Sequence, residues 1–374
     1  MIASLLTTTD ELAELEVCWE GLRQDCGGTI YASNGLIRTW FEAYSHFASP
    51  RVIIIEEGGE LLAAVPLASY TYRVAKLPMK VLALAGEVKD RLRLSTISPL
   101  FRDHRGNDLM HRTMKELGRM KWNLLTAVNL EDNGANRMFI DAVRANWQTE
   151  EFPPARKMTL DLPAEGSLMS SLDKKTRKNL EYRRRLLERE GHTMEFRKVC
   201  AEDIDPAVDI YAKHHIERWE KKGGSYFRNP ENVEFLKRYA GLTCRSGQGH
   251  FYELRIDGQV AAQDLYLLDG NVVYGDKTGM NNDFLRYSPG WFIQIHALDE
   301  LRDMGAERYV MGIGGERYKS EMGAVESPLL GIRATRGRAS MLGRLSRTSA
   351  FKYLDERLDL TKRTIDVQGE SPEA

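Results

Sequence analysis

The sequence predicts a mixed α/β protein of two domains. Its 374 residues are enough for two ordinary domains, and a hydrophobic content of 42% is ample for packed cores. Residues 249–280 contain strand-like runs separated by Asp257-Gly258 and Asp269-Gly270, turns that are typical of an antiparallel meander. Residues 271–313 then read as strand, turn, helix and strand, a βαβ unit. A mostly antiparallel sheet with flanking helices therefore follows.

Residues 1–150 are predicted to form the first domain. Its apolar residues recur at helical spacing over 10–22 and 36–47, and a Gly58-Gly59 turn joins two strand-like runs. Strands are expected at 52–55, 61–67, 81–85, 94–97 and 124–129, with further helices at 108–121 and 133–146. The acidic and proline-bearing stretch from Glu150 to Lys157 marks the boundary between the domains.

Residues 151–330 are predicted to form the second domain. Helices are expected at 168–191, 204–221, 232–243 and 291–304, with strands at 158–162, 193–199, 249–256, 259–268, 271–280 and 308–313. Residues 331–374 form a basic extension, predicted to be amphipathic and helical over 341–360 and disordered at its end. This extension would pack on the body of the protein or touch an anionic membrane or a partner.

Composition excludes several classes of protein. The net charge of −1 gives no overall field toward DNA or a membrane, so any such binding needs a local patch. The four cysteines form no C-x-x-C pair, which favours free thiols over disulfides or zinc. The N-terminus lacks the pattern of a signal peptide, and no run approaches 18 apolar residues, so we expect a soluble cytoplasmic protein without a transmembrane segment. The sequence does not fix the oligomeric state.

A turn of small residues opens the last predicted helix of the second domain. Ser288, Pro289 and Gly290 precede Trp291, where the apolar periodicity begins. A helix N-terminus presents unpaired N–H groups and the positive end of the helix dipole, so this turn could hold a phosphate. Ser as N-cap with Pro at N1 would explain the same residues without a ligand.

The most basic stretch lies in the predicted helix at 168–191. Its cations are Lys174, Lys175, Arg177, Lys178, Arg183, Arg184, Arg185 and Arg189. Such a face could hold a phosphate-rich group, as in a nucleotide sugar, CoA or tRNA. A solvated surface helix, balanced by the neighbouring glutamates, would carry the same charges.

Polar residues interrupt apolar elements elsewhere in the second domain. Gln263, Asp264 and Asp276 fall within predicted strands, where a polar side chain needs a partner, a solvent-exposed face or a wet cleft. His214 and His215 lie on one helix and point to different faces, so they do not form a simple metal site, and no metal is predicted. One histidine would pack or form a hydrogen bond while the other lines a cleft, where it could act as a base.

These motifs, taken in order, resemble the BioF2-like or CelD-like branch of the GNAT acyltransferases, which is related to the FemABX peptidyltransferases. The resemblance rests on DELAELEVCWEGL and SNGLIRTWFEAY near the N-terminus, KKTRKNLEYRRRLLE from Lys174, HHIERW before Gly223-Gly224, and Tyr287 to Gly290 followed by Tyr318-Lys319. It implies two tandem GNAT-like domains, each a mixed, mostly antiparallel sheet flanked by helices. The first would be degenerate, and the second would hold acetyl-CoA or another acyl-CoA.

The resemblance also implies site residues. The donor would meet Thr278, Gly279, Met280, Arg286, Tyr287, Ser288, Pro289, Gly290 and Trp291. The acceptor would meet Lys174, Arg177, Lys178, Arg184 and Trp219. Tyr318 and Lys319 would face the reacting centre, where Lys319 stabilises developing negative charge, and Asp264, Asp276 and His215 are candidates for the base. GNAT pyrophosphate loops read Gln/Arg-x-x-Gly-x-Gly/Ala, whereas this chain has Pro289 before its glycine.

Three functions are compatible with these features. The first is an N-acyltransferase that acts on an amine of a sugar, a peptide or a cell-envelope or exopolysaccharide precursor. The second is a FemABX-like peptidyltransferase that takes its donor from aminoacyl-tRNA. The third is an inactive GNAT-like scaffold in polysaccharide synthesis.

Overall fold

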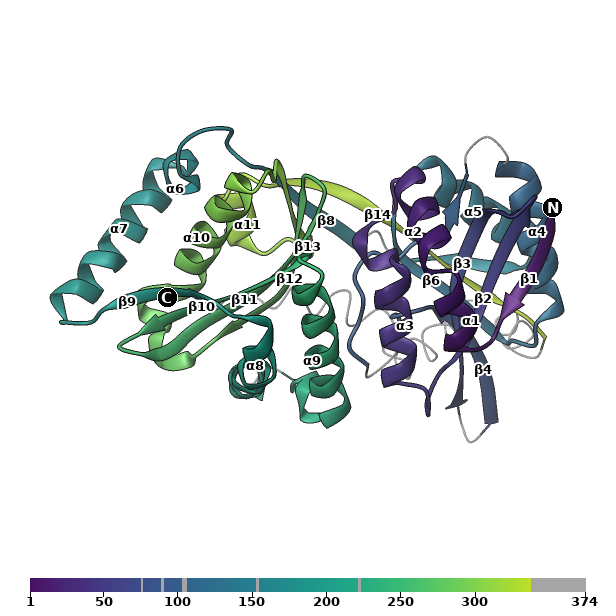
Figure 1. Ribbon diagram of the computed structural model, residues 1–374, viewed down its shortest axis with the longest axis horizontal. Helices are drawn as coiled ribbons and strands as arrows, with labels where there is room; N and C mark the ends of the chain where they lie inside the picture. The colour runs from purple at the N-terminus through teal and green to yellow at the C-terminus, as the bar shows by residue number, and fades with distance from the viewer. Residues whose placement is uncertain (75–76, 89–90, 103–105, 153–154, 221–222, 338–374) are drawn as a thin grey trace. The chain divides into compact units, whose positions relative to one another are not determined.

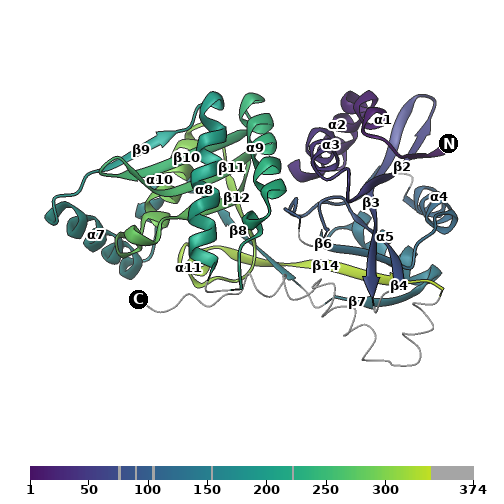
Figure 2. The same cartoon turned by 90° about the horizontal axis from the view of Figure 1, so that it is seen from below.

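The computed structural model describes residues 1–374 except 75–76, 89–90, 103–105, 153–154, 221–222 and 338–374. The chain divides into two compact units. Unit 1 comprises Met1–Ala155 with a returning segment that starts at Pro328, and unit 2 comprises Arg156–Ser327 (Figures 1 and 2). The helix expected at 341–360 lies outside the described residues. Among the helices that are described, none is both long and apolar enough to cross a bilayer.

Unit 1 contains one mixed sheet with flanking helices. Its elements are β1 (Ile2–Leu6), α1 (Thr9–Glu14), α2 (Glu16–Asp25), α3 (Asn34–Ala43), β2 (Ser49–Glu57), β3 (Glu60–Val74), β4 (Leu77–Leu84), β5 (Leu100–Phe101), α4 (Gly106–Arg119), β6 (Leu124–Glu131), α5 (Gly134–Asn146), β7 (Gln148–Glu151) and β14 (Val325–Thr335). The strand order is β1-β2-β3-β4-β6-β14, with β5 on β3 and β7 on β14. Only β4 and β6 pair in parallel among the described strands of this sheet.

Unit 2 is built in the same way. Its elements are β8 (Ala155–Asp161), α6 (Leu168–Ser171), α7 (Lys174–Arg189), β9 (Met194–Lys198), α8 (Ile204–Trp219), α9 (Pro230–Arg245), β10 (Gly249–Ile256), β11 (Gln259–Asp269), β12 (Val272–Met280), the 3₁₀ helix η6 (Asn282–Tyr287), α10 (Pro289–Asp303), β13 (Arg308–Ile313) and α11 (Arg317–Glu321). The order is β9-β10-β11-β12-β13-β8, in which β12 and β13 are parallel.

The two sheets share one topology. Each unit contains four consecutive antiparallel strands, β1 to β4 or β9 to β12. The fourth strand pairs in parallel with the strand that follows the next long helix, β6 or β13. A further strand, β14 or β8, lies antiparallel on the far side of it. The predicted fold class, tandem mixed and mostly antiparallel sheets flanked by helices, is confirmed. The helix that links each parallel pair is α4 in unit 1 and α10 in unit 2.

The core of unit 2 fixes the position of α10. Its residues Phe292, Ile295 and Leu298 are buried against Tyr266 of β11 and Tyr309 of β13. These apolar positions recur every three or four residues, which is the period that places them on one side of a helix. Burying this face holds the N-terminus of α10 beside the ends of β12 and β13.

Several local predictions were wrong. Leu15 ends α1 and begins α2, so residues 10–22 form two helices, and the bend lets Leu12 and Trp19 both be buried. Residues 94–97 are not a strand, because Thr96 has a φ of 42°, which interrupts an extended run. Residues 168–191 split into α6 and α7, since the carboxylate of Asp173 caps α7 through the N–H groups of Lys175 and Thr176.

The predicted C-terminal extension also differs from the structure at its start. Residues 331–335 continue β14, which pairs with β6 and β7 of unit 1. Ile332 and Ala334 are buried there. Arg333 and Thr335, which point to the opposite face of the sheet, are buried too, so both faces of this part of β14 are covered.

Candidate active site

The parallel strands β12 and β13 part at one point. Their ladder joins Val272, Val273 and Tyr274 to residues 308–310 and ends there, while β12 continues along β11 to Met280. Asp276 is a bulge in the β11 ladder, and bulges bend a strand. On the side that faced β13, residues 277–280 have no strand partner among the described residues. Backbone groups in such an opening can bind a ligand.

Glycine is required where the strands part. A Cβ atom on Gly275 would lie 2.6 Å from the hydroxyl oxygen of Tyr309, and one on Gly279 would lie 2.6 Å from the Tyr211 ring. No side chain other than hydrogen fits at either position. The two tyrosines therefore approach the backbone of β12 directly, one from each face of the sheet.

The N-terminus of α10 adjoins the end of β12. Ser288 has a φ of 57° and makes no side-chain cap, contrary to the capping role considered for it. Pro289 has no N–H, and the N–H of Trp291 donates to the Ser288 carbonyl. The N–H of Gly290 has no hydrogen-bond partner among the described residues, and a Cβ there would lie 2.7 Å from Met280 Sδ.

The turn before α10 is tied to α7. Glu190, the C-cap residue of α7, accepts hydrogen bonds from Arg286 and from the Tyr287 hydroxyl. Arg183 donates from Nη1 to the Arg286 carbonyl at 2.9 Å. The hydrogen bond from Tyr287 lowers the pKa of Glu190. Arg286 and Tyr287, predicted to bind the donor, thus hold the turn in place from outside.

A buried carboxyl group lies beside the end of β12. Asp264 of β11 is 1% exposed and faces Thr278 in the ladder. It accepts a hydrogen bond from the Tyr266 hydroxyl at 2.7 Å, and Oδ1 has no partner in the described structure. Burial raises the pKa of Asp264 to about 7, although hydrogen bonds from Tyr266 and Thr278 oppose that change. Asp264 can therefore be either protonated or ionised near neutrality.

Tyr318 of α11 lies against the first turns of α10. Its ring meets Trp291 edge-on at 6.3 Å between centroids, and its hydroxyl interacts with the side chain of Gln294. Burial raises the pKa of Tyr318 well above its usual range, and the charge of Asp264 contributes to that shift. The phenol is therefore a proton donor at neutral pH, and it senses the charge of Asp264.

Lys319 occupies a structural position. It is 3% exposed, and its ammonium group lies 3.2 Å from the Ile313 carbonyl, 3.1 Å from the Gly314 carbonyl and 2.6 Å from the Glu316 carboxylate. An ammonium group has three donors, and these three oxygens use them. Burial lowers the pKa of Lys319. Lys319 therefore has no free N–H group with which to stabilise a reacting oxyanion, which is the role predicted for it.

Asp276 and His215 each interact with partners of their own. Asp276 pairs with Lys277 at 2.7 Å. His215 binds Ser225 through Nδ1 at 2.8 Å and stacks on Trp219. Burial lowers the pKa of His215 to about 4, and the charge of Lys277 lowers it further. His214 is buried, with Nδ1 lacking a partner among the described residues.

The residues expected to bind the acceptor fall into two groups. Lys174 and Lys178 are exposed on α7, where Arg177 donates to the Ser170 carbonyl and Arg184 pairs with Glu188. Trp219 is on α8, stacked on His215. These residues lie on two separate helices, as expected from the helices predicted at 168–191 and 204–221.

Three contributors were missed by sequence reasoning. Tyr266 lies two residues after Asp264 on the same face of β11, Tyr309 is beside it on β13, and Gln294 reaches Tyr318 from α10. Period-two alternation along β11 was the available signal for Tyr266. No local pattern indicates Tyr309 or Gln294, because each meets the site through tertiary packing.

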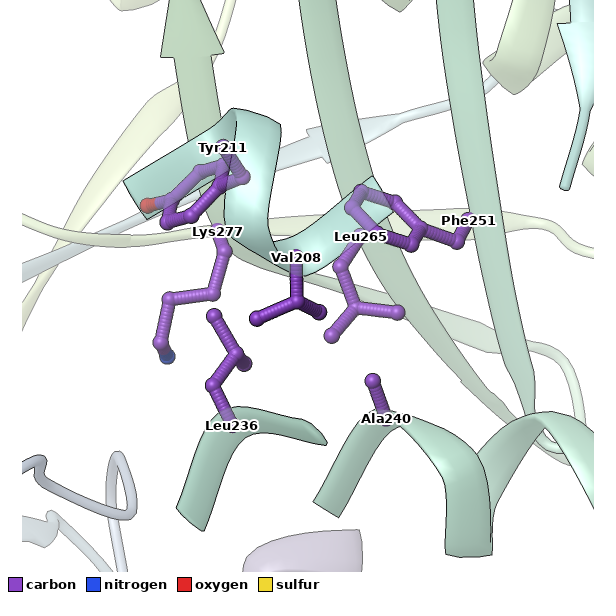
Figure 3. Close-up of a pocket in the computed structure, with 7 residues that line it drawn as sticks. All are labelled: Val208, Tyr211, Leu236, Ala240, Phe251, Leu265 and Lys277. Atoms are coloured by element: carbon purple, nitrogen blue, oxygen red, sulfur yellow. The ribbon is translucent and has the colours of Figure 1, made fainter. Parts of the chain in front are cut away.

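The other face of the sheet carries a small apolar gap with no room for a water molecule. Val208 and Tyr211 of α8, Leu236 and Ala240 of α9, and Phe251, Leu265 and Lys277 of the sheet line it. Figure 3 shows the Tyr211 hydroxyl and the Lys277 ammonium on the same side, away from Phe251. The residues that line the gap pack as part of the core, and the polar atoms of Tyr211 and Lys277 lie at one edge of it. No three His, Cys, Asp or Glu side chains in the described part of the chain are grouped to hold a metal.

In unit 1 the corresponding parallel strands, β4 and β6, also part, but a side chain lies in the opening. The parallel ladder of β4 and β6 ends at Ala83 and Thr126. Beyond it the carboxyl group of Glu87 accepts a hydrogen bond from the Val128 N–H at 3.1 Å. Glu87 is 4% exposed, and burial raises its pKa to about 8. In unit 1 a neutral carboxyl group therefore bonds to the strand backbone at this position. The corresponding strands of unit 2, β12 and β13, stay open there.

The residues of unit 2 fit an acyl-CoA in part. The open backbone of β12 and the carboxyl and phenol groups around it suit an extended acyl thioester. The α10 turn suits a pyrophosphate less well, since it offers one free N–H where a glycine-rich turn would offer several.

The comparisons with known proteins agree with this architecture. Residues 174–320 match the family model of an acetyltransferase (GNAT) domain. The structure of FemX covers 92% of this chain and 100% of its own at 12% identity, with a TM-score of 0.61. A protein of unknown function from Bacteroides thetaiotaomicron covers 89% and 100% at 10% identity, with a TM-score of 0.54. L-PGS from Bacillus licheniformis covers 93% and 97% at 12% identity, with a TM-score of 0.50.

No curated protein matches the chain. At 10–12% identity the structural likenesses show the fold alone, whereas the family model matches the sequence across α7 to α11. The predicted GNAT and FemABX-related resemblance is confirmed at this level. Residues 174–320 therefore match an acetyltransferase (GNAT) domain, and the chain as a whole has a fold similar to that of FemX.

Proposed function

We propose that the protein is an N-acyltransferase that transfers an acyl group to an amine of a sugar, a peptide or a cell-envelope or exopolysaccharide precursor. The observation that carries the proposal is the parting of β12 from β13 beside a carboxyl group whose pKa is about 7. The match to a GNAT domain supports the reaction class. Lys319 is set aside as a catalytic group, because its donors are used within the loop.

Attack by an amine on an acyl carbonyl requires removal of a proton from the amine. Asp264 is our candidate for the base: its Oδ1 has no partner, and its ionised form is accessible near pH 7. The donor would supply an activated carbonyl. Tyr318, which keeps its proton at neutral pH, would donate to the leaving atom.

The negative charge on the carbonyl oxygen needs N–H donors fixed in advance. We assign this role to the backbone of β12 between Lys277 and Met280, because the β13 side of that segment has no strand partner among the described residues. Donors of this kind need no reorganisation during the reaction, which is the source of their effect.

Thermal-shift and calorimetric titrations with acetyl-CoA, CoA and longer acyl-CoAs test the donor. A ligand that binds the folded state raises the melting temperature by mass action. We expect a shift that Gly290→Glu abolishes. Gly118→Glu is the control, because a Cβ on Gly118 of α4 meets nothing within 4 Å. A shift that both variants retain would contradict the placement at α10.

A second candidate is a peptidyltransferase that takes its donor from aminoacyl-tRNA. The likeness to FemX and the single free N–H at the α10 turn favour it. Salt-sensitive tRNA binding without any shift from CoA compounds would support this candidate. If a folded sample binds neither donor, the remaining hypothesis is a scaffold in polysaccharide synthesis.

A further inference from the structure

The cations of α7 form a line on its outer side. Lys174, Lys178, Arg185 and Arg189 follow the spacing i, i+4, i+11 and i+15, which keeps residues on one side of a helix. Leu180, Leu186 and Leu187 are buried on the opposite side. We name the four cations the outer stripe. At 1.5 Å per residue it extends over roughly 23 Å.

The two lysines of the outer stripe, Lys174 and Lys178, do not stabilise the helix that carries them. The first turn of α7 contains no acidic residue, although cations near a helix N-terminus oppose the helix dipole. Lys174, Lys178 and Arg189 make no ion pair with any described carboxylate, and Arg185 reaches Glu181 at 3.4 Å. The negative charge at this end of the helix comes from the N-cap residue Asp173, whose carboxylate accepts from the N–H groups of Lys175 and Thr176. The ammonium groups of Lys174 and Lys178 therefore face solvent, where an external anion can meet them.

The position of α7 limits what that anion can be. In both views α7 lies at the rim of unit 2, with no other described element beyond it (Figures 1 and 2). Its inner side holds the turn before α10 through Arg183 and Glu190. A small phosphate ligand at that turn would not reach four cations distributed along the outer side. The partner must be extended.

We propose that the outer stripe docks unit 2 on an anionic lipid surface. A flat surface meets a straight row of cations all at once. Near such a surface each Lys or Arg strengthens binding about fivefold. Tyr182, 53% exposed on the same helix, is of the amphipathic type that sits at the headgroup level. Single-stranded nucleic acid would require several aromatic platforms, and Tyr182 is the one aromatic residue of α7.

This docking holds whichever acyl donor is used. It would bring the open edge of β12 toward acceptors that reside at a membrane. Binding would be electrostatic and would therefore weaken as salt increases, since mobile ions screen exposed charges.

Cosedimentation of the full chain with vesicles tests the proposal. Vesicles of one-third phosphatidylglycerol in phosphatidylcholine are compared with phosphatidylcholine alone at about 0.1 M salt. We expect binding to the anionic vesicles only. The variant Lys174→Gln/Lys178→Gln/Arg185→Gln/Arg189→Gln should bind roughly 600-fold more weakly, because the free-energy contributions of four cations add.

The control removes four exposed cations elsewhere in unit 2, through Lys213→Gln, Arg228→Gln, Arg238→Gln and Arg317→Gln. It changes net charge equally and should bind as the unmodified chain does, with unchanged melting temperatures checking the fold. Equal loss in both variants, or full binding by the stripe variant, would overturn the proposal. Failure of the unmodified chain to bind anionic vesicles would also overturn it. The same holds if the chain binds a single-stranded RNA oligonucleotide and not the vesicles.

Discussion

Asp264 has a carboxyl group whose protonation should control the proposed reaction. If it is the base, the rate rises with pH as the group ionises and levels off above about pH 7. Asp264→Asn should lower turnover about 100-fold and remove this dependence, while donor binding stays unchanged. Thr278→Val removes a hydrogen bond that lowers the pKa, so the inflection should move to higher pH. Rates of acyl transfer between pH 5.5 and 9 provide the measurement, and an unchanged profile in Asp264→Asn would exclude Asp264 as the base.

Glu87 should make unit 1 less stable as pH rises. Its folded pKa of about 8 lies above the ordinary value of 4.5, so the folded state holds a proton that the unfolded chain releases between these values. The unfolding free energy should fall by up to about 1.4 kcal/mol per pH unit across that window, relative to Glu87→Gln. Denaturant titrations of both proteins at pH 5, 6 and 7 measure the difference. If the unfolding free energies of the two proteins change equally with pH, Glu87 is ionised in the folded state.

The loop after β13 depends on the buried ammonium of Lys319. Lys319→Ala leaves Glu316 and two carbonyls without their donor, so unit 2 should lose about 3 kcal/mol of unfolding free energy. Lys319→Met with Glu316→Gln removes both charges and should recover part of that loss. Denaturant unfolding checks both. A catalytic lysine would instead lose turnover at unchanged stability.

Helix α7 and the turn before α10 should move together. Glu190→Ala removes the acceptor for Arg286 and Tyr287, so backbone amides at 282–291 should exchange with solvent about tenfold faster. Glu188→Ala is the matched control, since Glu188 pairs with Arg184 on the exposed side of the same helix. Hydrogen exchange resolved by peptide distinguishes the two variants. Equal protection in both variants would mean that the hydrogen bonds to Glu190 do not order the turn.

Elements with strong local signals were predictable from the sequence. The strand at 249–256 and the strand at 308–313 have the predicted bounds, because turn residues punctuate clear apolar runs. Predictions failed where tertiary contacts decide the backbone, as at Leu15 and Thr96. Within the site, the sequence identified Asp264 and Tyr318 as candidates. It could not reveal that the donors of Lys319 are used, since those acceptors are backbone carbonyls placed by the fold.

At the scale of the whole molecule, unit 1 depends on the end of the chain. Strand β14 pairs with both β6 and β7, and its Leu329, Ile332 and Ala334 are buried. A chain that ends at residue 324 exposes the edge of β6 and leaves β7 without its ladder. We expect two thermal transitions in the full chain and loss of the one that belongs to unit 1 in the truncated chain. A chain ending at residue 337 is the control, and two transitions in both chains would show that β14 is dispensable.

The return of the chain to unit 1 also has a consequence in time. A ribosome finishes residues 1–155 before it begins unit 2, yet β14 emerges only after about 170 more residues. At ordinary rates of synthesis this interval is roughly ten to thirty seconds. During it, nascent unit 1 carries an unfilled place between β6 and β7, which is where a chaperone or a neighbouring nascent chain would bind. Within the described part of the chain, unit 2 is one continuous segment, Arg156–Ser327, so it can complete its fold before unit 1 receives β14.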